Sequence, residues 1–375
     1  MKIEKVTIKN FKSLRDIQID LKGLTLLTGV NSSGKSTFIQ ALLLLKQNEE
    51  ILYNYITYNL LNEIDKNPLR IANKLNLKGE YVNLGNKEDI FYEESYQDNI
   101  EFDILFSYGS LKISFDKSLT FTTKYTMKKL YQFIPDFQYI STDRIPPYNV
   151  YGLSGSHIEQ NLIGNSGEYT AHYLAKNPHK KLDIEQLKHP KAITNHLLEN
   201  VSLWLSEISQ GVNVRANLNE ALQQAIITYN YIYGESRTND YSPLNVGFGL
   251  TYVLPIIVAI LKAKPDDLLI IENPESHLHP AGQSKIAKLC ALAVANGVQI
   301  IVESHSDHFL NAIRVATKQD ILKAEDSVVY YFSKTSDSME TKVEEININA
   351  NGSIDAYPKG FFDQFDDDLD ALIEW

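Results

Sequence analysis

Residues 29–37, GVNSSGKST, have the residue types and the spacing of a loop that binds nucleotide phosphates. The segment fits the pattern GxxxxGK[ST], with Gly29, Gly34, Lys35 and Ser36 at its fixed positions. In such a loop successive backbone N–H groups converge on the phosphates, the lysine spans the β- and γ-phosphates, and the serine hydroxyl completes the ligands of Mg²⁺. The segment therefore predicts that the chain binds ATP with Mg²⁺.

Two later segments end apolar strands in side chains that could act on a phosphate. In residues 266–280, DDLLIIENPESHLHP, four apolar residues deliver Glu272 to the carboxyl end of a buried strand, where an acid can lie beside Mg²⁺. In residues 297–309, GVQIIVESHSDHF, another apolar strand ends in Glu303, Ser304 and His305. A histidine at that position can reach a γ-phosphate.

Simpler interpretations of these side chains stay open. Acidic residues at strand ends often cap helices, and His277, His279 and His305 could be ordinary polar residues or part of a metal cluster. A zinc site needs three or four ligands held together, which a loop beside Pro280 need not provide. The single cysteine, Cys290, excludes an intrachain disulfide and a multi-cysteine zinc site, and the apolar segment AKLCALAVA predicts that it faces a helical core.

The surrounding patterns predict the elements that hold these motifs in place. Alternating residues in KIEKVTIKNF and RDIQIDL predict an antiparallel strand pair, and LTLLTG predicts a buried strand that leads into the phosphate loop. Apolar residues at i, i+3, i+4 and i+7 in residues 36–46 predict a helix whose positive end points at the phosphates. Alternating segments between residues 51 and 136 predict a small antiparallel sheet with turns at Gly109 and Asp116.

Composition and charge narrow the functional classes. With 375 residues and 43% hydrophobic residues, the chain can bury a large core. Its net charge of -11 argues against nonspecific coating of nucleic acid, although a local basic groove inside a dimer would not show in the total. The N-terminus lacks the apolar stretch of a secretory signal, and the most apolar window, residues 253–261, is shorter than the ~20 residues of a membrane span. We therefore expect a cytoplasmic protein that makes no membrane contact.

Taken in order, the motifs resemble those of a known ATPase class. GVNSSGKST, NVGFGLTYVLP, LLIIENPESHLHP and IVESHS are similar to the ABC-type ATPase head of the SMC, RecF and OLD (overcoming lysogenization defect) group, most closely to the stand-alone OLD-like AAA-family ATPases of bacteria. The likeness covers most of the chain, including NFKSL, FQYISTDRIPP and YPKGFFDQF. It implies an α/β fold, an ABC-type P-loop ATPase head with mixed β-sheets around the P-loop helix and an inserted β/helical lobe.

The resemblance and the local patterns together predict four segments. They are the N-terminal part of the head with the Walker A loop, a β-rich lobe, an inserted helical lobe, and a C-terminal part with the signature, the Walker B acid, the switch histidine and an acidic tail, at residues 1–50, 51–140, 141–240 and 241–375. Within the helical lobe we expect helices at residues 168–175 and 193–209, followed by a strand at 225–234.

The resemblance also implies roles for single residues. The Walker A loop that binds the nucleotide comprises Gly29, Asn31, Ser32, Ser33, Gly34, Lys35, Ser36 and Thr37. Glu272 takes the Walker B position and holds Mg²⁺ together with Ser36, and His305 takes the position of the switch histidine. Residues 275–279 correspond to the D-loop region. Phe11, Lys12 and Ser13 are where such heads touch the base and the ribose.

The segment NVGFG looks like a divergent signature motif. The resemblance implies that Asn245, Gly247 and Gly249 are presented to the γ-phosphate of a nucleotide held by another protomer, and thus an ATP-sandwiched homodimer. A glycine-rich helix start suits this role because it offers unpaired N–H groups and the positive end of the helix dipole. Taken without the neighbouring motifs, the segment could equally be a plain loop-to-helix turn.

One position departs from the usual pattern of this class. Many ABC-type heads carry Asp-Glu at the Walker B end, and the second acid accepts a proton from the attacking water, but here Glu272 is followed by Asn273. A carboxamide cannot be that base. Either Glu272, Glu275 or His305 polarises the water, or turnover is slow and ATP is mainly a conformational ligand. We favour slow hydrolysis, with Lys35 stabilising the transferred phosphoryl group.

Two functions of different classes follow from the resemblance. The first is an ATP-gated dimer switch that controls a separate effector, a nuclease or a toxin, in anti-phage defence. OLD proteins proper carry a Toprim nuclease, for which the residues after the switch histidine leave no room, and the acidic end is interpreted as a solvated or docking tail. The alternative is a RecF-like clamp on DNA, for which residues 179–191, HKKLDIEQLKHPK, are the one obvious basic cluster. A nuclease that acts alone is disfavoured because its motifs are missing.

Overall fold

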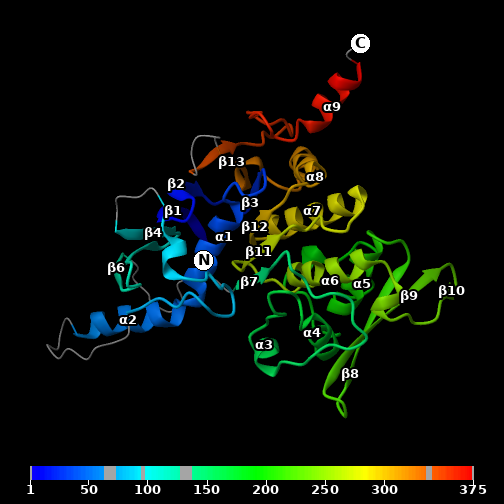
Figure 1. The fold of residues 1–375 in the computed structure, drawn as a ribbon. Helices are drawn as coiled ribbons and strands as arrows, with labels where there is room; N and C mark the ends of the chain where they lie inside the picture. The colour runs from blue at the N-terminus through cyan, green and yellow to red at the C-terminus, as the bar shows by residue number, and fades with distance from the viewer. Residues whose placement is uncertain (1, 63–72, 94–97, 127–136, 335–339, 374–375) are drawn as a thin grey trace.

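A six-stranded sheet forms the centre of the computed structural model, which describes residues 2–62, 73–93, 98–126, 137–334 and 340–373 (Figure 1). Its strand order is β14-β13-β3-β12-β11-β7. All neighbours pair in parallel except the edge strand β14, which runs antiparallel to β13. The strands are β3 (Leu24–Gly29), β7 (Phe137–Ile140), β11 (Leu268–Glu272), β12 (Gln299–Glu303), β13 (Ser327–Lys334) and β14 (Thr341–Ile346).

A five-stranded antiparallel sheet lies to one side of the central sheet, in the order β2-β1-β4-β5-β6. It consists of β1 (Ile3–Phe11), β2 (Leu14–Asp20), β4 (Asn99–Phe106), β5 (Gly109–Asp116) and β6 (Phe121–Tyr125). The predicted N-terminal strand pair and the predicted strands between residues 51 and 136 are confirmed. They form one sheet, because β1 pairs with both β2 and β4.

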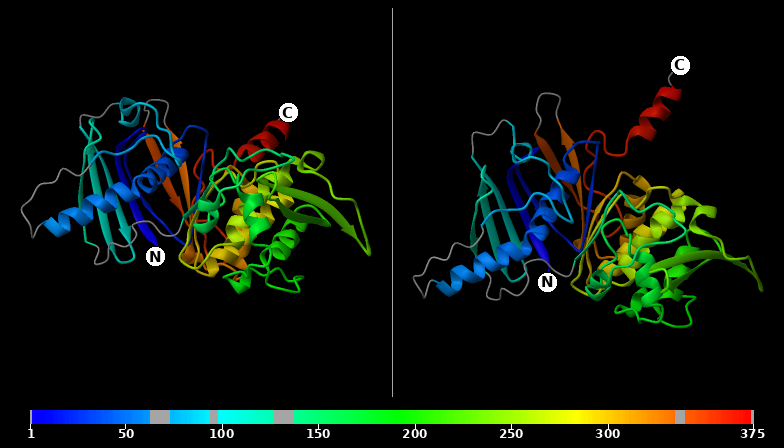
Figure 2. Two further views of the ribbon diagram at one scale, coloured as in Figure 1. Left: turned by 90° about the horizontal axis from the view of Figure 1, so that it is seen from below. Right: turned by 60° about the horizontal axis from the view of Figure 1, so that its bottom comes forward.

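Both faces of the central sheet are buried, and alternate strand residues enter two cores. Leu26 of β3 packs in the core that contains α6 (Phe248–Leu261), α7 (Pro280–Ala295) and α8 (Asp307–Lys318). Leu27 faces the other core, which α1 (Lys35–Gln47) shares with the five-stranded sheet. The views in Figure 2 show α1 and the five-stranded sheet on one side and the helical layer on the other. This burial on both sides explains why the central strands are continuous apolar runs.

The region 141–240 contains strands as well as the predicted helices. The helices are α3 (Gly155–Glu159), α4 (Thr170–Lys176) and α5 (Leu197–Ser206), so the predicted helices at 168–175 and 193–209 exist with shifted ends. A three-stranded antiparallel sheet accompanies them, with β8 (Val212–Asn219), β9 (Gln224–Tyr233) and β10 (Ser236–Arg237). The description as a helical lobe is therefore incomplete. Strand β8 was not predicted, because polar residues follow the short alternation of apolar and polar residues at the start of its sequence, VNVRANLN.

Further short elements complete the described chain. Helix α2 (Glu49–Asn62) falls at the start of the predicted β-rich lobe and was not expected, although Leu52 and Ile56, one helical turn apart, are buried. The C-terminal helix α9 (Gln364–Ile373) extends away from the body of the molecule (Figures 1 and 2). Four 3₁₀ turns are η1 (Lys87–Ile90), η2 (Glu185–Leu187), η3 (Pro243–Asn245) and η4 (Ala324–Asp326). Within the described part of the chain, no helix combines the length and apolarity that a membrane span requires.

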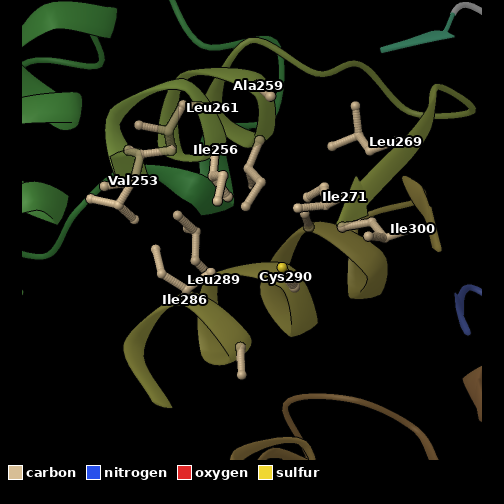
Figure 3. Packing of buried hydrophobic residues seen from close by; sticks show 14 of the residues in the cluster. Val253, Ile256, Ala259, Leu261, Leu269, Ile271, Ile286, Leu289, Cys290 and Ile300 are labelled. Carbon is tan, nitrogen blue, oxygen red and sulfur yellow. The ribbon is translucent and has the colours of Figure 1, made fainter. Parts of the chain in front are cut away.

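Helix α7 confirms the interpretation of Cys290. The thiol is fully buried beside α6 and the central sheet, among side chains that include Ile256, Ile271, Ile286 and Leu289 (Figure 3). Burial in this apolar environment raises the pKa of the Cys290 thiol to about 12. The thiol is therefore protonated and inaccessible in the folded protein.

We predict that Cys290 reports on unfolding. At mildly alkaline pH an aromatic disulfide reagent should label the native chain slowly, because the reactive thiolate is suppressed and the sulfur is covered. Labelling should become fast in urea, with a midpoint equal to that of the circular dichroism transition. Since the sequence has one cysteine, each labelled molecule reports exposure of Cys290 alone. Rapid labelling of the native chain would contradict the packing of α7.

Candidate functional site

The phosphate loop, residues 29–37, joins the end of β3 to the start of α1 as predicted. Its two fixed glycines stand where other residues do not fit. Gly29 has φ 133°, and a Cβ there would lie 2.0 Å from the Phe332 carbonyl oxygen. Gly34 has φ 110°, and its Cβ would lie 2.3 Å from Thr341 Oγ1. Glycine can adopt these positive φ values, and its missing side chain leaves room for the close approach of β13 and β14.

Thr341 of β14 braces the loop from outside. Its hydroxyl oxygen is 2.8 Å from the Ser33 carbonyl oxygen and 2.8 Å from the Ser13 hydroxyl oxygen, and its backbone N–H donates to the Ser13 carbonyl at 2.9 Å. The β1–β2 turn thus lies against the phosphate loop. The same turn holds Lys12, whose Nζ donates to Gln40 Oε1 on α1 at 2.7 Å. The sequence contained no local sign of the role of Thr341.

A cavity of about 430 Å³ opens over the loop, and we call it the phosphate-loop cavity. It brings together most of the predicted nucleotide-binding residues and adds Glu303 and Lys334, to which the sequence analysis gave no role. Its walls are formed by Lys12, Ser13, Asn31, Ser32, Ser33, Gly34, Lys35, Ser36, Thr37, Glu303, His305 and Lys334. With three lysines and one carboxylate in its walls, the cavity suits a polyanion.

Lys35 is held inside the loop in this structure. Its side chain is 3% exposed, and Nζ donates to the carbonyl oxygens of Gly29 at 3.0 Å and Val30 at 2.9 Å. Desolvation by burial lowers the Lys35 pKa, while the charge of Glu303 raises it. The ammonium group is therefore positioned at the phosphate loop by two neutral acceptors, which a charged phosphate oxygen can replace.

Glu303 is the carboxylate of this cavity. It ends β12, the strand next to β3, and each of its two carboxylate oxygens lies 3.1 Å from Ser36 Oγ. Burial and the neighbouring Glu272 raise the Glu303 pKa to about 7. The sequence places Glu303 at the end of an apolar strand, which is a signal for a role at the site. It does not show that this strand lies next to β3.

Glu272 ends the next strand, β11, and Asn273 follows it; neither residue lines the phosphate-loop cavity. Glu272 Oε2 accepts a hydrogen bond from the Thr142 N–H at 3.2 Å and also lies 3.2 Å from the Thr142 hydroxyl oxygen. Burial raises the Glu272 pKa, and these hydrogen bonds oppose the shift. The same Thr142 hydroxyl oxygen is 2.5 Å from Asn273 Oδ1, so the amide faces the 141–144 segment. The assignment of Glu272 as a Mg²⁺ ligand stays a prediction.

Glu275 and His305 are in direct contact. One Glu275 oxygen accepts from the His305 backbone N–H at 2.7 Å and the other from the Ser304 hydroxyl at 2.9 Å. Glu275 thus positions the turn after β12. Burial and the nearby Lys35 lower the His305 pKa, so its imidazole is neutral near pH 7. His305 also borders a second cavity of about 280 Å³, whose other walls include Tyr331 and residues 360–363.

Arg144 ties the end of β11 in place, and sequence reasoning missed it. Its side chain is 2% exposed. Its guanidinium donates to the carbonyl oxygens of Ser141 at 3.0 Å, Glu272 at 2.8 Å and Asn273 at 2.8 Å, and lies 5.0 Å from the Tyr252 ring centroid. Burial lowers the Arg144 pKa to about 10. An arginine in the polar segment TDRIPP has no local pattern that distinguishes it from a surface residue.

The signature segment, residues 245–249, lies outside the phosphate-loop cavity of its own chain. Gly247 precedes α6, and a Cβ added there would meet no atom within 4 Å, whereas a Cβ on Gly249 would lie 2.5 Å from the His277 carbonyl oxygen. The exposed Phe248 ring packs with Tyr252 and His277, with centroids 4.7 Å from each. The signature segment therefore rests on the predicted D-loop region.

The predicted D-loop histidines have structural partners. His277 belongs to the aromatic group with Phe248 and Tyr252, and His279 caps α7 by accepting from the Ala281 N–H at 3.3 Å. Because His277 has φ 63°, the HLH segment is not an extended strand with both rings on one face. Their contacts fit the interpretation of these two histidines as ordinary polar residues.

Comparison with known proteins identifies the family of the chain. The family described as AAA ATPase domain matches residues 1–242 and 193–310, and a family described as protein of unknown function (DUF3696) matches residues 322–372. No curated protein matches the chain.

Two solved structures share the fold over nearly the whole chain. An SMC head bound to the C-winged helix domain of ScpA is 15% identical, with a TM-score of 0.54 over 93% of this chain and 98% of that one. An SMC head with an extended coiled coil, bound to the C-terminal domain of ScpA and derived from Pyrococcus furiosus, is 13% identical, with a TM-score of 0.52 over 99% of each chain. The predicted fold class, an ABC-type P-loop ATPase head, is confirmed.

The contact between Gly249 and His277 leads to a stability prediction. Gly249→Ala should lower the free energy of unfolding by about 1–3 kcal/mol, because the new methyl group meets a backbone carbonyl. Gly247→Ala is the matched control. It adds the same methyl group in open space, so its thermal midpoint should equal that of the wild type. Equal midpoints for both variants would show that α6 does not rest on residue 277.

Proposed function

The chain belongs to the AAA ATPase domain family, and from this premise we propose that it is an ATP-gated dimer switch that controls a separate effector. The family and the fold support an ATPase of the ABC-head kind that binds a nucleotide. The observation that carries the rest of the proposal is the division of the site. The phosphate-loop cavity collects the Walker A residues, whereas the signature segment of the same chain lies outside it.

The proposed dimer joins these two halves. Gly247 precedes α6 in open space, and the helix start offers free N–H groups and the positive end of a dipole. Facing the phosphate-loop cavity of a second copy, this helix start would complement the terminal phosphate there. Leu244 and Phe248, which flank Gly247, are 57% and 41% exposed, and a partner surface would cover them.

Within each cavity the chain's own groups can bind the nucleotide. Lys35 would exchange its two carbonyl acceptors for phosphate oxygens, which are stronger acceptors because they are charged. Lys12 and Lys334 line the same cavity and add positive charge along the phosphate chain. The neutral His305 imidazole can donate a hydrogen bond to the terminal phosphate from the turn that Glu275 holds.

The donor set also fits Mg²⁺. The Ser36 hydroxyl and the carboxylates at the ends of β11 and β12 are hard oxygen ligands of the kind that Mg²⁺ prefers, and the phosphates and water supply the other ligands. When bound, Mg²⁺ would neutralise phosphate charge and polarise the phosphoryl group. The resemblance implies that Ser36 and Glu272 hold the ion, whereas Glu303 is the carboxylate that contacts Ser36 in this structure.

We propose that hydrolysis is slow. The Asn273 carboxamide cannot be the base, and two of the three groups considered in its place have other partners. Both Glu275 oxygens accept hydrogen bonds from residues 304 and 305, and Glu272 accepts one from the Thr142 N–H. Positioning and charge stabilisation by Lys35 would then supply most of the catalysis, so ATP would keep the dimer closed for long periods.

The C-terminal region supports an effector that is separate from this chain. The segment 360–363 borders the cavity next to Gly29 and His305, and it leads into α9. Helix α9 extends from the body, with Leu369, Leu372 and Ile373 exposed beside acidic residues (Figure 1). Such a helix can dock on a partner. That the effector is a nuclease or a toxin of anti-phage defence follows from the resemblance to OLD-like proteins alone.

The structure lends no particular support to the DNA clamp. Two basic residues of the segment 179–191 are engaged inside the chain: Lys180 donates to Asn161 and Tyr173, and His189 packs on Trp204 with ring centroids 5.0 Å apart. Salt-sensitive binding of duplex DNA by the ATP-bound chain would favour the clamp over the switch.

We predict that two single variants separate the halves of the composite site. Lys35→Ala should weaken ATP binding by about 10- to 100-fold or more, because it removes a buried charged donor from the phosphate loop. Gly247→Asp should leave ATP binding unchanged, because residue 247 lies outside the cavity of its own chain. It should abolish ATP-dependent dimers, since it brings a carboxylate to the partner's phosphates. Fluorescent nucleotide titration and sedimentation measure these effects.

Mixing the two variants gives a sharper test. In a mixed dimer the Lys35→Ala chain still offers an intact signature segment to the intact phosphate loop of the other chain. Phosphate release should therefore reappear in the mixture although each variant alone releases little. No recovery, or a wild-type chain that stays monomeric with ATP and Mg²⁺, would contradict the composite site.

A further inference from the structure

The order of the central strands separates two acidic residues that look equivalent in the sequence. Both Glu272 and Glu303 end apolar parallel strands, and the register pairs them directly with each other. However, β12 lies between β3 and β11, so Glu303 is one strand from the phosphate loop and Glu272 is two strands away. Glu303 pairs with Leu27, two residues before the loop begins.

The contacts of the two acids differ in the same way. Both Glu303 oxygens lie 3.1 Å from the hydroxyl oxygen of Ser36, which is the serine of the phosphate-loop pattern. That hydroxyl has one proton, so at any moment it can satisfy one of the two carboxylate oxygens. Glu272 instead accepts a hydrogen bond from the Thr142 N–H, and it does not line the phosphate-loop cavity.

The negative charge of the Glu303 carboxylate would be stabilised by a cation. The Lys35 amino group is 4.0 Å from Glu303 Oε1, beyond hydrogen-bonding distance, and it donates to two carbonyl oxygens instead. The Glu303 side chain is 6% exposed, so water screens it little. Phosphates bound in the same cavity would bring more negative charge against this carboxylate. A divalent cation between them would remove the repulsion.

We propose that Glu303, with the hydroxyl of Ser36, ligates the Mg²⁺ that accompanies the nucleotide, and that Glu272 does not touch the ion. This assignment rests on the proposed nucleotide binding and changes the acid that the resemblance implies. A protein hydroxyl and a single carboxylate suffice, since Mg²⁺ keeps several waters and takes its other ligands from phosphates. The described residues contain no cluster of three or more His, Cys, Asp or Glu side chains that could form a complete protein cage.

The test measures metal affinity without turnover. The full chain is loaded with ADP and titrated with Mn²⁺, and the free ion is counted from its electron paramagnetic resonance signal. Glu303→Gln should weaken Mn²⁺ binding by about 10-fold or more, because a neutral amide oxygen replaces a charged ligand and each 1.4 kcal/mol is tenfold in affinity. Glutamine keeps the size of the side chain and can still bond to Ser36, so the thermal midpoint should stay at or above that of the wild type.

Glu272→Gln is the matched control, because it makes the same change at the paired position of the next strand. It should weaken Mn²⁺ binding clearly less than Glu303→Gln does, because a charge two strands from the phosphate loop acts on the ion only at a distance. When a chelator removes all divalent metal, Glu303→Gln should bind fluorescent ADP at least as tightly as the wild type does. The reason is that the substitution removes a negative charge from the wall of the cavity. That pattern separates loss of a metal ligand from damage to the nucleotide site.

The outcomes distinguish the two proposals. Wild-type Mn²⁺ affinity in Glu303→Gln, or an equal or larger loss in Glu272→Gln, overturns the assignment of the ligand and leaves nucleotide binding standing. A wild-type chain that binds no ADP with or without metal contradicts the proposed function itself, and this assignment with it.

Discussion

The parallel pairing of β3, β12 and β11 is the constraint on which the candidate site depends. Parallel neighbours end at the same edge, so residues 29, 303 and 272, far apart in the chain, arrive side by side. The arrangement also places two carboxylates next to each other at a buried edge, which is costly when no cation faces them. The two adjacent carboxylates thus lower the stability of the unliganded protein at the edge where they could bind a cation. Such a local cost is common at sites for charged ligands.

Much of this could be predicted from local patterns, and the remainder depended on tertiary contacts. The phosphate loop, β11 and β12 have their own spacing and apolar runs, so their type and their acidic ends could be predicted from a few residues each. Local patterns could not show which acid lies beside the loop, because that depends on strand order. Lys334 and Thr341 reach the site from strands near the C-terminus, and Arg144 from a polar loop. None of the three has neighbours that distinguish it from a surface residue.

The contacts around Arg144 join parts of the molecule that the proposed dimer would use for different nucleotides. The Phe248 ring, in the signature segment, packs on Tyr252 and His277, and the guanidinium of Arg144 lies over Tyr252. The same guanidinium holds the backbone at the end of β11. Direct contacts therefore run from the exposed Phe248 ring, at the surface that would meet a partner, through Tyr252 to the buried Arg144 and the chain's own acidic edge.

The brace formed by Ser13, Ser33 and Thr341 also bears on how the protein is made. The β1–β2 turn and the phosphate loop leave the ribosome early, but the strand that closes over them arrives only when residue 341 has been synthesised. A nascent chain thus carries an unbraced loop until β14 has been made and can pair with β13. The arrangement of the phosphate loop therefore depends on a strand 308 residues further along the chain, and a chain cut before β14 would lack this brace.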